Sequence, residues 1–138
     1  MDLKQIKNKI MEIIKELAGF NNLIDNISFH HVPSIGDRGR ICCNVNNFHI
    51  HIFQRVSGFG MELRPRSVRE RRALEKKMNE FNSAKLMRKD GVFYPWPNKI
   101  TDGKAENLKR LNVLIEIATI SNFNDLSSST KRILVKKI

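Results

Sequence analysis

The stretch RICCNVNNFHIHIFQRVSGFGMELR, residues 40–64, decides the fold because its apolar residues alternate with polar ones on both sides of a turn. The dipeptide Asn46-Asn47 tolerates the positive φ that a tight hairpin turn needs, so Val45 is expected to pair with Phe48. Successive side chains of a strand point to opposite faces of the sheet. One face of this hairpin is therefore predicted to be apolar, and it carries Ile41, Cys43, Val45, Phe48, Ile50 and Ile52.

A second turn is expected at Ser57-Gly58, leading into a third strand that ends at Arg64. A two-residue turn there places Ile52 opposite Leu63, His51 opposite Arg64 and Phe53 opposite Glu62. A one-residue slip would bury histidine and arginine, so the alternation selects this set of faces. The outer face is predicted to be exposed and to carry Arg40, Cys42, Asn44, His49, His51, Phe53, Arg55, Glu62 and Arg64.

Helices are predicted before and after these strands in the sequence. Apolar residues recur with helical spacing in Asp2 to Ala18, in Val68 to Arg88 and in Lys104 to Ile120. Ile27 to Val32 and Val92 to Trp96 are expected to be further strands, the latter at an edge because of its prolines. The sequence thus predicts an α+β fold in the order α-β-β-β-β-α-β-α. A meander of four to five antiparallel strands is packed on its apolar face by helices.

The chain has 138 residues, a length that suits one domain. We expect a single α+β domain over residues 1–126. Residues 127–138 begin with serines and end in KRILVKKI, so they are expected to form a basic C-terminal segment that serves as a hinge or a late element.

The charge balance favours a polyanionic partner. The chain has 25 Lys and Arg against 14 Asp and Glu, a formal net charge of +11. Nucleic acid is the first expectation and an acidic protein the second. Cys42 and Cys43 are neighbours on a strand and are not expected to pair, which suits a reducing compartment. No run approaches the roughly 20 apolar residues that cross a bilayer, so we expect a cytoplasmic protein without a membrane partner.

Arginine is concentrated in RPRSVRERR, residues 64–72. On the predicted helix, Arg69, Arg72 and Lys76 share a stripe opposite the apolar one, so this stripe must face solvent. Arginine binds phosphate through paired hydrogen bonds, and an aromatic ring on a basic sheet can stack on a base. The leading hypothesis is a non-enzymatic domain that binds DNA or RNA. Its contacts are expected from Phe53, Arg55, Arg64, Arg66, Arg69, Arg72 and Lys76, with Arg64, Arg66 and the helix start forming an anion site.

Two alternatives use the same residues differently. In a metal-independent endoribonuclease of the toxin type, His49 and His51 would be acid and base, Glu62 their partner, and Arg64 the phosphate clamp. In a protein-interaction regulator, the basic surface would dock on an acidic partner.

No cofactor or metal is expected. Cys42, His49 and His51, with His30, are ligand types that zinc accepts, but their spacing does not match a paired zinc motif. A two-metal nuclease is disfavoured because the predicted sheet offers a single carboxylate, Glu62.

Overall fold

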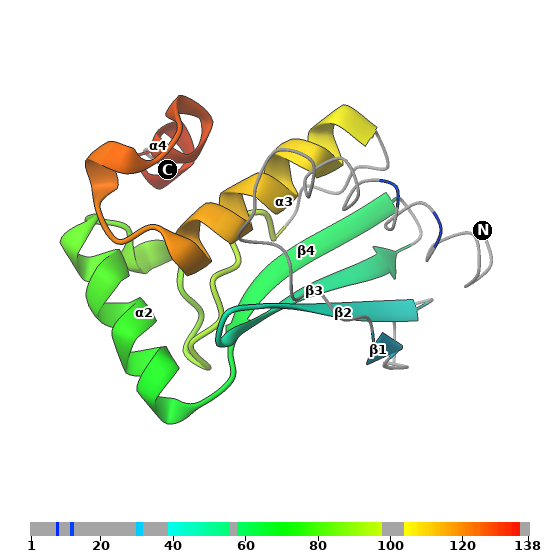
Figure 1. Ribbon diagram of the computed structural model, residues 1–138, viewed down its shortest axis with the longest axis horizontal. Coiled ribbons are helices and arrows are strands. Elements are labelled where there is room, and N and C mark those ends of the chain that lie inside the picture. Colours follow the sequence, from blue (N-terminus) through cyan, green and yellow to red (C-terminus); the bar gives the residue numbers. More distant parts are fainter. Residues whose placement is uncertain are drawn as a thin grey trace.

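The computed structural model describes residues 30–31, 39–55, 58–97 and 104–135, together with Asn8 and Glu12. This part of the chain is α+β and antiparallel in its sheet (Figure 1). The long strands are β2 (Gly39–Val45), β3 (Phe48–Arg55) and β4 (Gly58–Pro65), and the two-residue strand β1 (His30–His31) lies beside β2. The helices are α2 (Val68–Glu80), α3 (Lys104–Thr119) and α4 (Ser128–Leu134), with short 3₁₀ turns η2 (Ala84–Leu86) and η3 (Phe123–Asp125).

Two predicted elements fall mainly outside the described residues. Asn8 and Glu12 are helical, and the rest of the expected helix from Asp2 to Ala18 is not described. Of the expected strand from Ile27 to Val32, only His30–His31 is described, and it pairs antiparallel with β2.

The first hairpin has the predicted register. Val45 pairs with Phe48, and Cys43 pairs with Ile50 two steps along the ladder. Asn46 has a φ of 54°, the left-handed conformation that asparagine adopts more readily than most residues. The two-residue turn at Asn46-Asn47 is therefore confirmed.

The second hairpin is shifted from its predicted register. Ile52 pairs with Met61 instead of Leu63, because Gly58 belongs to β4 and pairs with Arg55. In this register Phe53 lies opposite Gly60, and a Cβ on that glycine would collide with the Phe53 ring. The ring thus needs a glycine partner, which explains the position of the turn. The partner changes by two residues, so each side chain keeps its predicted face.

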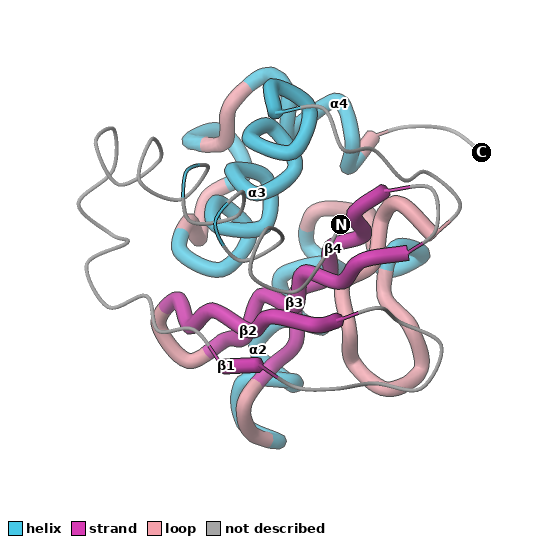
Figure 2. Tube along the Cα trace, turned by 90° about the vertical axis from the view of Figure 1, so that its right-hand side faces the viewer, coloured by secondary structure: helices cyan, strands magenta, loops and turns pink. Residues whose placement is uncertain are grey.

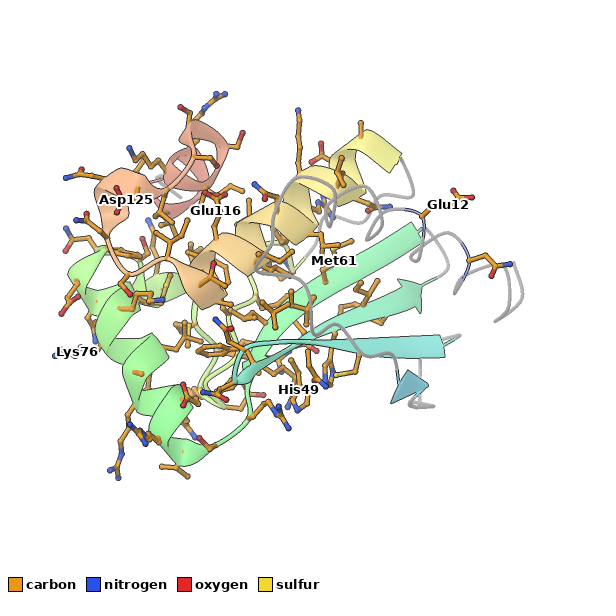
Figure 3. The ribbon with its side chains drawn as sticks, viewed as in Figure 1. Glu12, His49, Met61, Lys76, Glu116 and Asp125 are labelled. Atoms are coloured by element: carbon orange, nitrogen blue, oxygen red, sulfur yellow. The ribbon has the colours of Figure 1, made fainter. Side chains whose placement is uncertain are left out.

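The apolar face of the sheet forms one side of the core. Helix α3 lies across this face, and Met61 points from β4 toward it (Figures 1 and 3). The buried cluster joins strand residues to α2 and α3 and includes Ile50, Ile52, Met61, Leu63, Leu74, Met78, Leu111 and Leu114. The prediction that helices pack on the apolar face is correct for this described part.

Helix α2 is shorter than predicted. It ends at Glu80 instead of Arg88, because Asn82 turns the chain with a φ of 56°. The Ser83 amide then donates to the Met78 carbonyl over 2.8 Å, which satisfies an acceptor at the helix end. The residues that follow leave the helix, and Phe93 among them pairs with Leu63 of β4.

The expected strand from Val92 to Trp96 is reduced to isolated bridges. Phe93 exchanges two backbone hydrogen bonds with Leu63 of β4, with N···O distances of 2.9 and 3.0 Å. Pro95 carries no amide hydrogen and cannot extend this ladder. The pairing therefore adds a short, local extension to the β4 edge of the sheet.

The C-terminal segment contributes a helix to the core. Helix α4 packs against α3, and Leu134 is part of the buried cluster (Figure 2). Its first turn is held by Glu116 of α3, whose carboxylate accepts from the Ser127 amide over 2.6 Å and from the Ser127 hydroxyl over 2.8 Å. Among the described helices, none combines the length and the apolar character needed to cross a membrane.

Candidate functional site

The segment of residues 86–94, beside β4, brings Tyr94 and Arg88 to the polar face of the sheet. This face carries Cys42, His49, His51, Phe53, Glu62 and Arg64. The Arg88 amide donates to the Val92 carbonyl over 2.8 Å, and the Tyr94 amide donates to the Leu86 carbonyl over 3.1 Å. Since Phe93 shares the apolar face with Leu63, the neighbouring Tyr94 lies on the other face. The segment therefore places Tyr94 and Arg88 beside β4 on its polar side.

The centre of this polar face is a buried carboxylate surrounded by basic groups. Glu62 is 2% exposed. Its Oε1 lies 3.6 Å from Nη1 of Arg64 and 4.0 Å from Nδ1 of His51, and its Oε2 lies 3.5 Å from Nη1 of Arg88. We call these four residues the Glu62 cluster. Burial of a carboxylate is costly unless cations or hydrogen bonds compensate it, and the two arginines of the cluster supply positive charge.

The two predicted histidines lie next to each other. The ring centroids of His49 and His51 are 6.0 Å apart, and the rings meet edge to face. The Cys42 Sγ lies 3.1 Å from Nδ1 of His49. Burial raises the pKa of the Cys42 thiol, while the positive charges of Arg66 and Arg64 oppose that rise. Figure 3 shows His49 on the side of the sheet opposite to Met61.

The polar face is more covered than predicted. Cys42 and Glu62 are buried, and Phe53 is 2% exposed beneath Tyr94, with ring centroids 6.2 Å apart. The guanidinium of Arg88 in turn lies 5.4 Å from the centre of the Tyr94 ring. The expectation that Phe53 stacks on a base is therefore corrected, because another aromatic ring already covers it. The predicted ladder partner of Phe53 was Glu62, and the structure puts Gly60 there.

The basic stripe of α2 faces solvent. Arg66 precedes the helix, and Arg69, Arg72 and Lys76 follow on it; all four are exposed. Within the described part of the chain, none of these four forms an ion pair. Their neighbour Arg71 differs, because its Nε pairs with Glu75 over 3.1 Å and its Nη2 donates to the Lys89 carbonyl over 2.6 Å. Figure 3 shows Lys76 pointing away from the body of the protein.

The start of α2 is already capped by its own residues. The Ser67 hydroxyl accepts from the Glu70 amide over 3.2 Å, and the Glu70 carboxylate accepts from the Asn47 side chain over 3.3 Å. A carboxylate in the first turn already complements the helix dipole. The expected anion site at Arg64, Arg66 and the helix start thus meets an acidic residue, and we do not retain the helix start as part of it.

The polar face and the basic stripe adjoin at the junction between β4 and α2. The Arg66 amide donates to the Asn47 carbonyl over 3.1 Å, which ties this junction to the turn between β2 and β3. The charges of Arg64 and Arg66 both oppose the rise in the pKa of the Cys42 thiol, so both lie within electrostatic reach of the polar face. Arg64 therefore belongs to the Glu62 cluster and also begins the run of arginines.

Of the predicted site residues, His49, His51, Glu62 and Arg64 are brought together, whereas Arg69, Arg72 and Lys76 form a separate stripe. The Arg55 side chain lies outside the described part of the structure. Arg88 was missed because the helical pattern was extended through it. The structure instead places Arg88 in a turn, where it pairs with Asp90 over 2.7 Å and Gly91 has a φ of 83°.

The described residues offer no group of three or more histidine, cysteine or acidic side chains placed to hold a metal ion. A cavity of about 490 Å³ lies elsewhere, between the end of α2 and α4. Its described lining contains no histidine, cysteine or arginine and consists of Glu80, Phe81, Asn82, Lys85, Phe123, Leu134 and Val135. The cavity therefore lacks the histidine, cysteine and arginine side chains that lie together on the polar face of the sheet.

Comparison with known proteins found no matching family model, no matching curated protein and no matching solved structure.

Proposed function

We propose that this protein binds nucleic acid through the basic stripe of α2 and the adjoining Arg64 and Arg66. The observation that carries the proposal is the set of four exposed cations, Arg66, Arg69, Arg72 and Lys76, without an ion pair among the described residues. A cation with no carboxylate partner can bind a phosphate without first losing an internal contact.

The net charge supports the same proposal. A formal charge of +11 attracts a polyanion over distances longer than a direct contact, and the stripe supplies the cations that the phosphates would contact directly. Arg64 extends the stripe toward the two histidines because it lies on the polar face, opposite His49 in the ladder. Phe53 is left out of the proposed contacts, since Tyr94 covers it.

The expected binding is salt-dependent and tolerant of sequence. Contact with about four phosphates predicts that the logarithm of the affinity falls with the logarithm of salt concentration with a slope of about −3 to −4. Fluorescence anisotropy with labelled single-stranded RNA, single-stranded DNA and duplex DNA, between about 50 and about 300 mM salt, measures this slope. Comparison of the probes also shows which nucleic acid is preferred.

Charge reversal locates the surface. We expect Arg69→Glu combined with Arg72→Glu to weaken binding by about tenfold or more and to make the slope shallower by about 2. The matched control is Arg132→Glu combined with Lys109→Glu, which changes the net charge equally on α4 and α3. Equal weakening by both double variants would show that the effect depends on net charge alone and not on the position of the cations on α2. Binding that does not respond to salt or to the α2 reversals would contradict the proposal and leave an acidic protein as the remaining partner class.

A further inference from the structure

A buried carboxylate beside two histidines and two arginines is an arrangement that can do chemistry as well as bind. The Glu62 cluster is fixed from three directions, by β3, by β4 and by the segment that carries Arg88. His49 adds a second imidazole beside His51. We propose that this face is a metal-independent RNA-cleaving site, an inference that rests on the proposed nucleic-acid binding.

The position of Glu62 assigns a role to His51. Its Oε1 lies 4.0 Å from Nδ1 of His51, which is longer than a hydrogen bond but close enough for the negative charge to stabilise the imidazolium that forms when the other nitrogen, Nε2, takes up a proton. Catalytic contacts in proteins without substrate are commonly longer than in the reacting complex. His51 is therefore the general base, and Glu62 is a positioning residue that acts through it.

His49 is placed to act as the acid. Its Nδ1 lies against the Cys42 thiol at 3.1 Å, which holds the ring and directs Nε2 toward the substrate in this assignment. A separation of 6.0 Å between the ring centroids lets the two imidazoles address different oxygens of one phosphate group. Acid and base on opposite sides of the scissile bond are what in-line displacement at phosphorus requires.

The two arginines supply the remaining requirement, stabilisation of negative charge. Arg64 is 34% exposed and Arg88 is 42% exposed, although one terminal nitrogen of each lies near Glu62. A guanidinium has five N–H donors, so Arg64 keeps donors for a phosphate while the carboxylate holds its orientation. Arg88 keeps fewer, because its Nε and Nη2 also donate to the Asp90 carboxylate over 3.2 and 2.7 Å. Preorganised donors of this kind stabilise the charge that develops on the phosphorus oxygens in the transition state.

The reaction needs RNA and no other reactant. Nε2 of His51 removes the proton of a ribose 2′-hydroxyl, and the 2′-oxygen forms a bond to the adjacent phosphorus. The bond from phosphorus to the 5′-oxygen of the next nucleotide breaks with its electron pair, and His49 gives that oxygen a proton. The products are a 2′,3′-cyclic phosphate and a free 5′-hydroxyl, and the two histidines have exchanged protonation states. DNA cannot react in this way because it lacks the 2′-hydroxyl.

The test uses the full chain with a short single-stranded RNA, the same sequence with 2′-O-methyl groups, and the same sequence as DNA, all in EDTA. We expect cleavage of the RNA alone, with cyclic-phosphate ends identified by mass spectrometry. His51→Ala and His49→Ala should each lower the rate by about 100-fold or more. Added imidazole should partly restore the rate of His51→Ala. Arg132→Ala, on the distant helix α4, should cleave at the unaltered rate.

Binding of the 2′-O-methyl strand is measured in the same preparations, which separates the two proposals. Intact RNA that is nevertheless bound would overturn the catalytic inference and leave the proposed function standing. RNA that is neither bound nor cleaved would overturn both. Cleavage that persists at the same rate in His51→Ala purified in parallel, or that also occurs in DNA, would overturn the mechanism. His51→Asn, which keeps a polar side chain at this position, replaces the alanine variant if thermal unfolding shows that the latter is unfolded.

Discussion

The buried carboxylate of Glu116 offers the sharpest test of how the C-terminal helix is held. Glu116 is 7% exposed and accepts hydrogen bonds from four groups. These are the Ser127 amide, the Ser127 hydroxyl, the Asn112 side-chain amide at 3.0 Å and the Thr130 hydroxyl. Thr130 is 0% exposed, so its hydroxyl has no access to bulk water in place of the carboxylate. Glu116→Ala therefore removes the acceptor that these four donor groups share.

The size of the effect follows from these contacts. A hydrogen bond to a charged group contributes about 1.5–3 kcal/mol net, and contributions within one network do not simply add. Water can reach Ser127, which is half-buried, but not Thr130. We expect Glu116→Ala to lower the free energy of unfolding by about 3–5 kcal/mol. Glu116→Gln should cost less, about 1–2 kcal/mol, because its amide oxygen still accepts while its NH₂ group faces other donors.

Urea unfolding followed by circular dichroism measures these differences, and hydrogen exchange of the α4 amides shows whether the loss is local. The control is Glu80→Ala, which removes an exposed carboxylate from α2 and should change stability by no more than about 0.5 kcal/mol. A loss below about 1 kcal/mol in Glu116→Ala, or an equal loss in Glu116→Gln and Glu116→Ala, would refute the account of Glu116 as the acceptor that fastens α4.

Two other positions give independent tests. Gly60→Ala should destabilise by about 1–3 kcal/mol in urea unfolding because its Cβ meets the Phe53 ring, and combining it with Phe53→Val should recover part of that loss; additive losses would count against the contact. In a Cys43→Ser background, Cys42 should react with a thiol reagent much more slowly in the native state than in urea, because burial raises its pKa and blocks access. Because the folded pKa of the Cys42 thiol is raised, the contribution of this thiol to the free energy of unfolding is fully present below the unfolded pKa of 9.0. That contribution is lost as the pH rises through the folded pKa. Equal reaction rates in the two states would exclude that burial.

The face assignment was predictable because it depends only on alternation. The second turn was misplaced by one residue, yet His51, Glu62 and Arg64 still share a face, since the error moved each ladder partner by two residues. The turn position agrees with a cross-strand contact, the Phe53 ring against Gly60, which alternation alone does not reveal. Periodicity therefore identified the members of the polar face without identifying their neighbours.

Exposure was not predictable in the same way. Alternation separates two faces of a sheet but does not say what lies on either of them. Tyr94 covers Phe53 only because α2 ends at Glu80 and the following segment returns beside β4. The signal for that ending was Asn82, whose side chain tolerates a positive φ, together with its neighbours Phe81 and Ser83, which are weak helix formers.

The structure divides the arginines into two groups with different capacities. Arg64 lies near the buried carboxylate of Glu62, and Arg88 lies near Glu62 and pairs with Asp90, so the orientation of both arginines is restricted and their net attraction for a polyanion is reduced. Arg69 and Arg72 have no such partner within the described residues and remain able to follow a phosphate backbone. In the proposed complex with nucleic acid, affinity is therefore expected to come mainly from α2, whereas accurate positioning of the strand is expected to come from the sheet. Because the two groups meet at the junction of β4 and α2, a strand bound along the helix would have its next phosphates directed toward Arg64 and the paired histidines.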